Sequence, residues 1–79
     1  MNEQKIKQDT IRIGKNIREI RKKSGIGQTE LVRMIQLSGI EMTRETLIKI
    51  ERCTQHIQAS QLKAIKEALN TSYDDLLKP

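Results

Sequence analysis

The sequence predicts an all-α fold, a compact bundle of four helices with a short fifth helix near the carboxyl end. Apolar residues recur at spacings of three and four in four separate stretches, which is the period of an amphipathic helix. No stretch alternates between apolar and polar residues as a half-buried strand does. The 79 residues are enough for one domain with a limited core. Because Phe and Trp are absent, Ile, Leu, Val and Met must form that core.

The first helix is expected to continue to about Ser24. Asp9 or Thr10 can cap its start by accepting hydrogen bonds from free backbone amides. Its apolar stripe consists of Ile13, Ile17 and Ile20. Gly25 is expected to end it in a left-handed conformation, after a basic last turn that complements the negative end of the helix dipole. Residues 1–8 are polar and are expected to form a flexible arm, so the domain itself is expected to span 9–79.

Two amphipathic runs follow, on either side of a break at Gly39. The first run opens at Gln28, after Gly27 in the cap position, and its apolar positions are Leu31, Val32, Met34 and Ile35. The second run is capped by Thr43 and turns Leu47 and Ile50 inward. Ile40 and Met42, within the break, are expected to attach the turn to the core. Two short helices joined in this way form an angled pair, of which the DNA-binding helix-turn-helix is the best-known case.

The second helix of this pair has an outward face that is mostly polar and charged. This face consists of Arg44, Glu45, Ile48, Lys49 and Arg52. A net charge of +5 and a pI near 9.7 favour a polyanionic partner. We therefore expect this face to enter the major groove of double-stranded DNA. Ile48 either touches a thymine methyl group or is an ordinary exposed isoleucine.

The remaining third of the chain is expected to close the bundle. Residues 54–58 lack periodicity and are expected to form a loop anchored by Ile57. A fourth amphipathic helix is expected over about 58–69, with Asn70 ending it. Ser72 can cap a last helical turn over 73–77, where two aspartates favour the helix start.

Composition argues against several other classes of protein. A single Cys excludes an intrachain disulfide and fits a reducing, cytoplasmic location. No apolar run approaches the ~20 residues that a membrane span needs. Cys53 and His56 are the only Cys and His, too few for a metal site or for an oriented nucleophile and base. We therefore expect no enzyme activity, no cofactor, no metal and no small-molecule ligand.

The order of these elements resembles that of a known family. The segments IGKNIREIRKKSGIGQTELVRMIQ, TRETLIKIE and QLKAIKEALNTSYDDLL are similar to the Xre family of lambda-repressor-like helix-turn-helix domains, the Cro and cI type. The similarity covers roughly residues 13–77. It implies a sequence-specific DNA-binding protein, a transcriptional regulator and most simply a repressor, that acts as a homodimer on a two-fold related operator.

The resemblance also implies roles for individual residues. Side chains at base-reading positions are Arg44, Glu45 and Lys49. Side chains at phosphate-binding positions are Gln28, Thr43 and Arg52. Arg21 and Glu51 match a structural ion pair between the first and third helices, which belongs to the scaffold and not to the site.

The sequence departs from the family pattern at three places. Val32 stands where the family usually has Ala, so the second and third helices must cross slightly further apart. Cys53 stands where Gly normally ends the third helix, so a different local geometry is possible there, since a left-handed Cys costs ~1 kcal/mol relative to Gly. The basic residues that the family has in the next loop are absent from 54–56, which predicts weaker binding per monomer.

A protein-interaction or antitoxin-like module with the same fold is the main alternative. Its candidate contacts are Leu76, Leu77 and Ile48. Leu77 and Tyr73 are candidates for a dimer surface. The two readings differ in salt dependence, because affinity for phosphate falls steeply with salt and an apolar contact barely responds.

Overall fold

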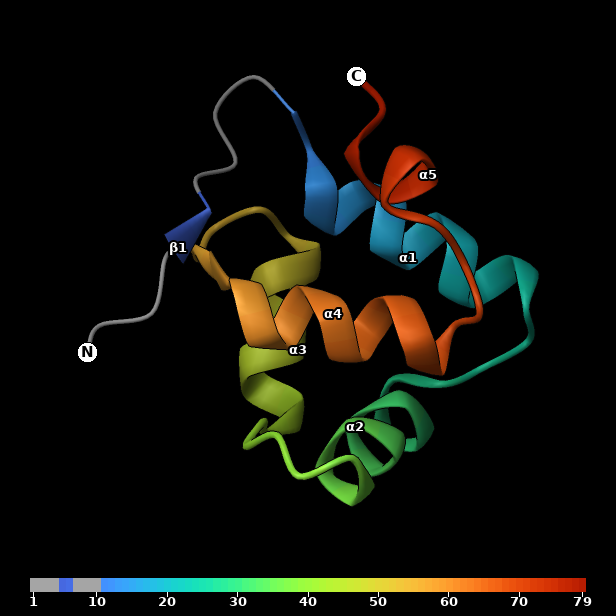
Figure 1. Ribbon diagram of the computed structural model, residues 1–79, viewed down its shortest axis with the longest axis vertical. Coiled ribbons are helices and arrows are strands. Elements are labelled where there is room, and N and C mark those ends of the chain that lie inside the picture. Colours follow the sequence, from blue (N-terminus) through green and yellow to red (C-terminus); the bar gives the residue numbers. More distant parts are fainter. Residues whose placement is uncertain (1–4, 7–10) are drawn as a thin grey trace.

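Within the part of the chain that the structure describes, five helices and one two-stranded sheet make up the fold (Figure 1). The computed structural model describes residues 5–6 and 11–79. The elements are β1 (Lys5–Ile6), α1 (Ile13–Lys23), α2 (Gln28–Leu37), α3 (Arg44–Glu51), β2 (Ile57–Gln58), α4 (Ala59–Ala68) and α5 (Tyr73–Leu77). Helix α1 packs against α3 and α5, and α2 packs against α3 and α4. The helical architecture agrees with the sequence prediction.

The core is aliphatic, as the composition requires. Its fully buried side chains are Ile13, Ile17, Leu31, Ile35, Leu47, Ile50, Ile57, Ile65 and Leu76. Each predicted amphipathic run contributes to this set. Ile26 and Ile40 pack against the core from the two turns beside α2, and Met42 is itself buried, so both turns are attached to the core as expected.

Most helix ends follow the predicted chemistry. Gly25 ends α1 at φ 73°, and Asn70 follows α4 at φ 51°. Ser72 caps α5 by accepting a hydrogen bond from the backbone N–H of Asp75 at 3.1 Å. The start of α1 differs. It begins at Ile13, later than expected, and Arg12 precedes it without a capping hydrogen bond from its side chain. The two expected cap residues, Asp9 and Thr10, lie outside the described residues.

The small sheet corrects the prediction of a purely helical fold. Residues 5–6 pair antiparallel with 57–58, in the register Lys5 with Gln58 and Ile6 with Ile57. Ile6 packs partly buried against the core. This segment was expected to belong to a flexible arm, but residues 5–6 form the edge strand of a sheet. The rest of the predicted arm lies outside the part of the chain that the structure describes.

Candidate nucleic-acid interface

The interface is built on the angled pair α2 and α3. Four hydrogen bonds order the turn between them: Gln36 Nε2 donates to the carbonyl of Met42 at 2.7 Å, and Ser38 Oγ donates to the carbonyl of Ile35 at 2.6 Å. Thr43 caps α3 by accepting from the backbone N–H of Thr46 at 3.1 Å, and the two Thr hydroxyls share a hydrogen bond of 3.0 Å. The start of α3 is thereby fixed relative to α2.

A buried ion pair fixes the other end of α3. Arg21 Nε donates to Glu51 Oε2 at 2.7 Å and Arg21 Nη2 donates to Glu51 Oε1 at 2.9 Å. Both residues are buried, at 7% and 6% exposure. Hydrogen bonding to Glu51 raises the pKa of the Arg21 guanidinium above its ordinary value, although burial alone lowers it. This is the predicted scaffold pair, joining α1 to α3.

Gln28, at the start of α2, joins the same network. Its Nε2 donates to Glu51 Oε1 at 3.1 Å, so the side chain braces α3. An amide nitrogen carries two N–H groups, and only one is needed for this bond. The second is the group that can donate to a phosphate.

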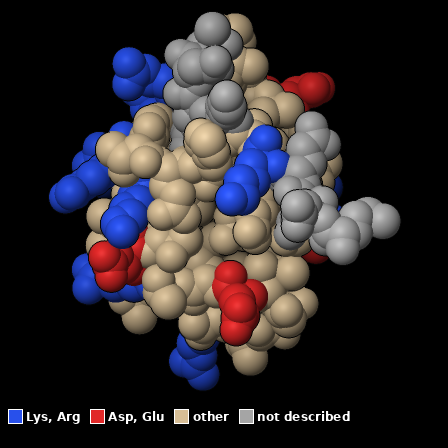
Figure 2. Space-filling model, turned by 90° about the vertical axis from the view of Figure 1, so that its left-hand side faces the viewer, with Lys and Arg blue, Asp and Glu red and all other residues tan. Residues whose placement is uncertain are grey.

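The outward face of α3 is charged and exposed. Arg44, Glu45, Lys49 and Arg52 are all exposed, whereas Leu47 and Ile50 on the inner side are fully buried. Lys49 Nζ lies 3.4 Å from Glu45 Oε1, one turn away. Figure 2 shows the side of the molecule on which β1 and α3 lie, with blue Lys and Arg side chains gathered along one edge and few red ones between them.

Arg18 is a further candidate that the sequence reasoning did not single out. Together with Gln28, Ile48, Glu51 and Arg52 it lines a hollow of about 370 Å³ at the junction of α1, α2 and α3. This hollow is flanked by two arginines and by the amide of Gln28, a set that suits an anion. The sequence did contain a signal for Arg18. It stands three residues before Arg21 and therefore lies on the same face of α1 as Arg21.

Cys53, one of the departures from the family pattern, is accommodated in the left-handed conformation that Gly would take. Cys53 has φ 60°, so it takes the left-handed conformation in spite of its side chain. Its N–H donates to the carbonyl of Ile50 at 2.9 Å, and the Thr54 N–H donates to Lys49 at 3.0 Å, which closes the end of α3. The possibility of a different geometry here is therefore not realised. Val32 is buried in the core at 6% exposure, and the wider crossing of α2 and α3 that it implies stays a prediction.

The candidate contacts of the protein-interaction alternative are mostly not exposed. Leu76 is fully buried and Leu77 packs partly buried against the core, while Ile48 is half-buried. Leu76 therefore cannot contact a partner as that alternative expected. Tyr73 remains 40% exposed, with Lys66 Nζ 5.1 Å from its ring centroid.

Metal-binding clusters and membrane-spanning helices are both absent from residues 5–6 and 11–79. No group of three or more His, Cys, Asp or Glu side chains lies close enough together there to hold a metal ion. None of the helices described is both long enough and apolar enough to span a membrane.

Comparison with known proteins identifies one related fold. No protein-family model matches the chain, and no curated protein matches it. The fold is similar to that in the crystal structure of the restriction-modification controller protein C.AhdI from Aeromonas hydrophila, with a TM-score of 0.73. The match covers 85% of this chain and 94% of that one, at 19% sequence identity. A solved controller protein thus has the same fold as this chain.

Proposed function

We propose that this protein is a sequence-specific binder of double-stranded DNA, a transcriptional regulator that places α3 in the major groove. The observation that carries the proposal is the construction of α3. Its outward face carries Arg44, Lys49 and Arg52, while its inner face is anchored in the core and its last residue, Glu51, is held by Arg21. A rigid helix with an exposed basic face can present donors to guanine and phosphate without first being ordered.

Roles within the proposed complex follow from position. Arg44, Glu45 and Lys49 read base edges, where Arg or Lys pairs with guanine and Glu accepts from cytosine. Gln28, Thr43 and Arg52 bind the phosphate backbone, and such contacts set the register without reading sequence. The Thr43 hydroxyl oxygen accepts the capping hydrogen bond of α3, so the hydroxyl proton is the group that it donates to a phosphate.

One copy of α3 reads only a few base pairs, so we propose a homodimer that acts in the cytoplasm on an operator with two-fold symmetry. Its half-sites lie one helical turn, about 34 Å, apart. Repression is the simplest outcome, because occupying an operator is enough to block transcription. The similarity of fold to a restriction-modification controller protein supports the regulatory role.

The test is selection of binding sites from a random duplex pool, followed by affinity measurements on the winners at two salt concentrations. The expected result is an enriched palindrome whose affinity falls steeply with salt. Weak binding without enrichment contradicts base reading. No binding at any salt concentration contradicts DNA binding and favours the protein-interaction module.

A further inference from the structure

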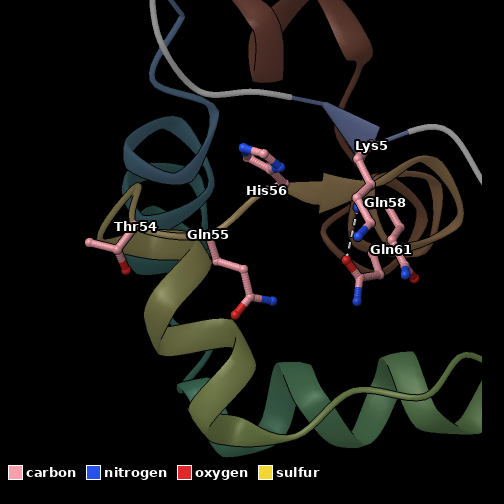
Figure 3. A pocket seen from close by; sticks show the side chains of 6 residues that line it. All are labelled: Lys5, Thr54, Gln55, His56, Gln58 and Gln61. Atoms are coloured by element: carbon pink, nitrogen blue, oxygen red, sulfur yellow. Dashed lines mark hydrogen bonds between the residues drawn. The ribbon is translucent and has the colours of Figure 1, made fainter.

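A polar hollow lies beyond the end of α3 and is separate from the face of α3 itself. Its volume is about 400 Å³, and its lining comes from β1, the α3–α4 loop, β2 and α4 (Figure 3). The lining residues are Lys5, Thr54, Gln55, His56, Gln58 and Gln61. None of them is acidic. Figure 3 shows Gln55 directed from the end of α3 toward the space beside Gln61.

The sheet register places Lys5 at this hollow. Lys5 stands opposite Gln58 and Ile6 stands opposite Ile57. Directly opposed residues of an antiparallel pair share a face, and neighbours along a strand take opposite faces. Ile6 and Ile57 form the core side, because Ile57 is fully buried and Ile6 packs partly buried against the core. Lys5 and Gln58 therefore share the outer side, where both line the hollow.

The two glutamines are oriented as donors. They form a capping box at the start of α4: the Gln58 side chain accepts from the backbone N–H of Gln61, and Gln61 Oε1 accepts from the backbone N–H of Gln58 at 3.0 Å. Both amide oxygens thus already accept a capping hydrogen bond, and the side-chain N–H groups are the donors that the pair can offer to the hollow. Gln61 is only 7% exposed, which holds its amide in this orientation.

The hollow is attached to the proposed recognition helix. Thr54 donates to the carbonyl of Lys49 with both its N–H and its hydroxyl, each at 3.0 Å. The eight residues of α3 extend about 12 Å, close to the ~12 Å width of the major groove. The phosphate backbone that borders the groove would therefore pass next to the protein segment just beyond α3.

We propose that this hollow binds a phosphate of the DNA backbone and that Lys5 supplies its positive charge. The inference rests on the proposed function and extends it to β1. The family's basic residues are absent from 54–56, and in this proposal Lys5 of the amino-terminal strand supplies the cation in their place. Lys5 provides the charge, and the amides of Gln58 and Gln61 provide neutral donors, a combination that suits a phosphate.

The first variant to test is Lys5→Gln in the full chain, with Lys63→Gln as the matched control. Lys63 is an exposed lysine of α4 that does not line the hollow. Affinity is measured against salt on a selected site and on an unrelated duplex. Lys5→Gln is expected to weaken binding equally on both and to reduce the slope of log K against log salt by ~0.9, the value for one phosphate contact. Lys63→Gln is expected to keep the wild-type slope.

The second variant, Gln61→Glu, separates binding from stability. A Glu at this position keeps the oxygen that accepts from the Gln58 N–H and favours the positive end of α4. The melting temperature is therefore expected to stay the same or rise, while the new carboxylate repels phosphate and lowers affinity on every duplex. If Gln61 only caps α4, Gln61→Glu is expected to keep its affinity for DNA, because the variant is as stable as the wild type.

The outcomes distinguish this inference from the function on which it rests. If the wild-type protein binds DNA and both variants keep its slope and affinity, the phosphate site is wrong and DNA binding stands. If the wild-type protein binds no DNA, the phosphate site and the proposed function are both wrong. Titration with inorganic phosphate covers a third case. Phosphate would then shift the NMR signals of backbone amides at 54–61 in the wild type but not in Lys5→Gln, while the salt slope for DNA binding would be the same in both. That result would indicate a site for free phosphate and overturn the assignment to DNA.

Discussion

Lys49 and Glu45 form an ion pair one turn apart on the outward face of α3, with Nζ 3.4 Å from Oε1. The two side chains are 53% and 78% exposed, so this pair is screened by water and adds little to stability. Both residues are proposed to read bases. In the proposed complex this contact is exchanged for contacts with base edges, and losing so exposed a pair costs little.

Replacing Glu45 tests its proposed role as a base reader. Glu45→Gln removes one negative charge from the face and releases Lys49, so affinity for unrelated duplexes is expected to rise while discrimination between sequences falls, by ~1–3 kcal/mol at one base pair. The melting temperature should hardly change. The measurement compares affinities for the selected site and for single-base variants of it. Glu67→Gln, an exposed glutamate on α4, is the charge-matched control. Unchanged discrimination in Glu45→Gln would show that Glu45 reads no base.

Removing Arg21 should be far more damaging to the fold. Arg21→Ala leaves the buried Glu51 carboxylate with Gln28 as its one side-chain partner among the described residues, and breaking a buried pair in this way typically costs ~3–5 kcal/mol. The free energy of unfolding in urea gives the value. Arg18→Ala removes an exposed arginine one turn earlier and is expected to leave stability within ~0.5 kcal/mol of wild type. Equal stability of the two variants would mean that the ion pair contributes nothing to the fold.

Much of this architecture could be predicted because its signals are local. The cap at Thr43, the left-handed ends at Gly25 and Asn70, and the aliphatic stripes depend on residues a few positions apart, and all are present in the structure. The Arg21–Glu51 pair is different, because its members are thirty positions apart. Only the resemblance to a family indicated it.

The sheet could not be predicted from the sequence. A two-residue strand is too short to show alternation, and β1 is specified by its partner more than fifty positions away. The polar hollow was missed for the same reason, since Lys5 meets Gln61 only through that pairing. Leu37, 79% exposed at the end of α2, was also missed as a surface residue, because amphipathic spacing does not say where a buried stripe stops.

Cys53 gives a direct test of backbone strain. Its φ of 60° is costly for any residue with a side chain, so Cys53→Gly is expected to raise the free energy of unfolding by ~0.5–1 kcal/mol, after the larger chain entropy of Gly is taken into account. Cys53→Ala is the matched control, because it also removes the thiol but keeps a Cβ. Chemical denaturation of both variants decides the matter. A gain of stability in Cys53→Ala as large as that in Cys53→Gly would assign the effect to the thiol and not to φ.

Arg44 and Arg52 lie at opposite ends of α3, both exposed, and are proposed to do different things. Arg44→Ala removes a base contact, so it should lose ~1–3 kcal/mol on the selected site and much less on unrelated duplexes. Arg52→Ala removes a phosphate contact, so it should weaken binding on all sequences alike and reduce the salt slope by ~0.9.

The comparison between these two variants carries the test, because each controls for loss of one arginine charge. Affinities are measured for both on the same set of duplexes and salt concentrations, after urea unfolding has shown that each variant is folded. Equal losses on every sequence for Arg44→Ala would remove it from base reading. A loss of affinity confined to the selected site for Arg52→Ala would instead show that Arg52 reads a base. The end of α3, next to the hollow at Arg18, would then lie deeper in the groove than proposed.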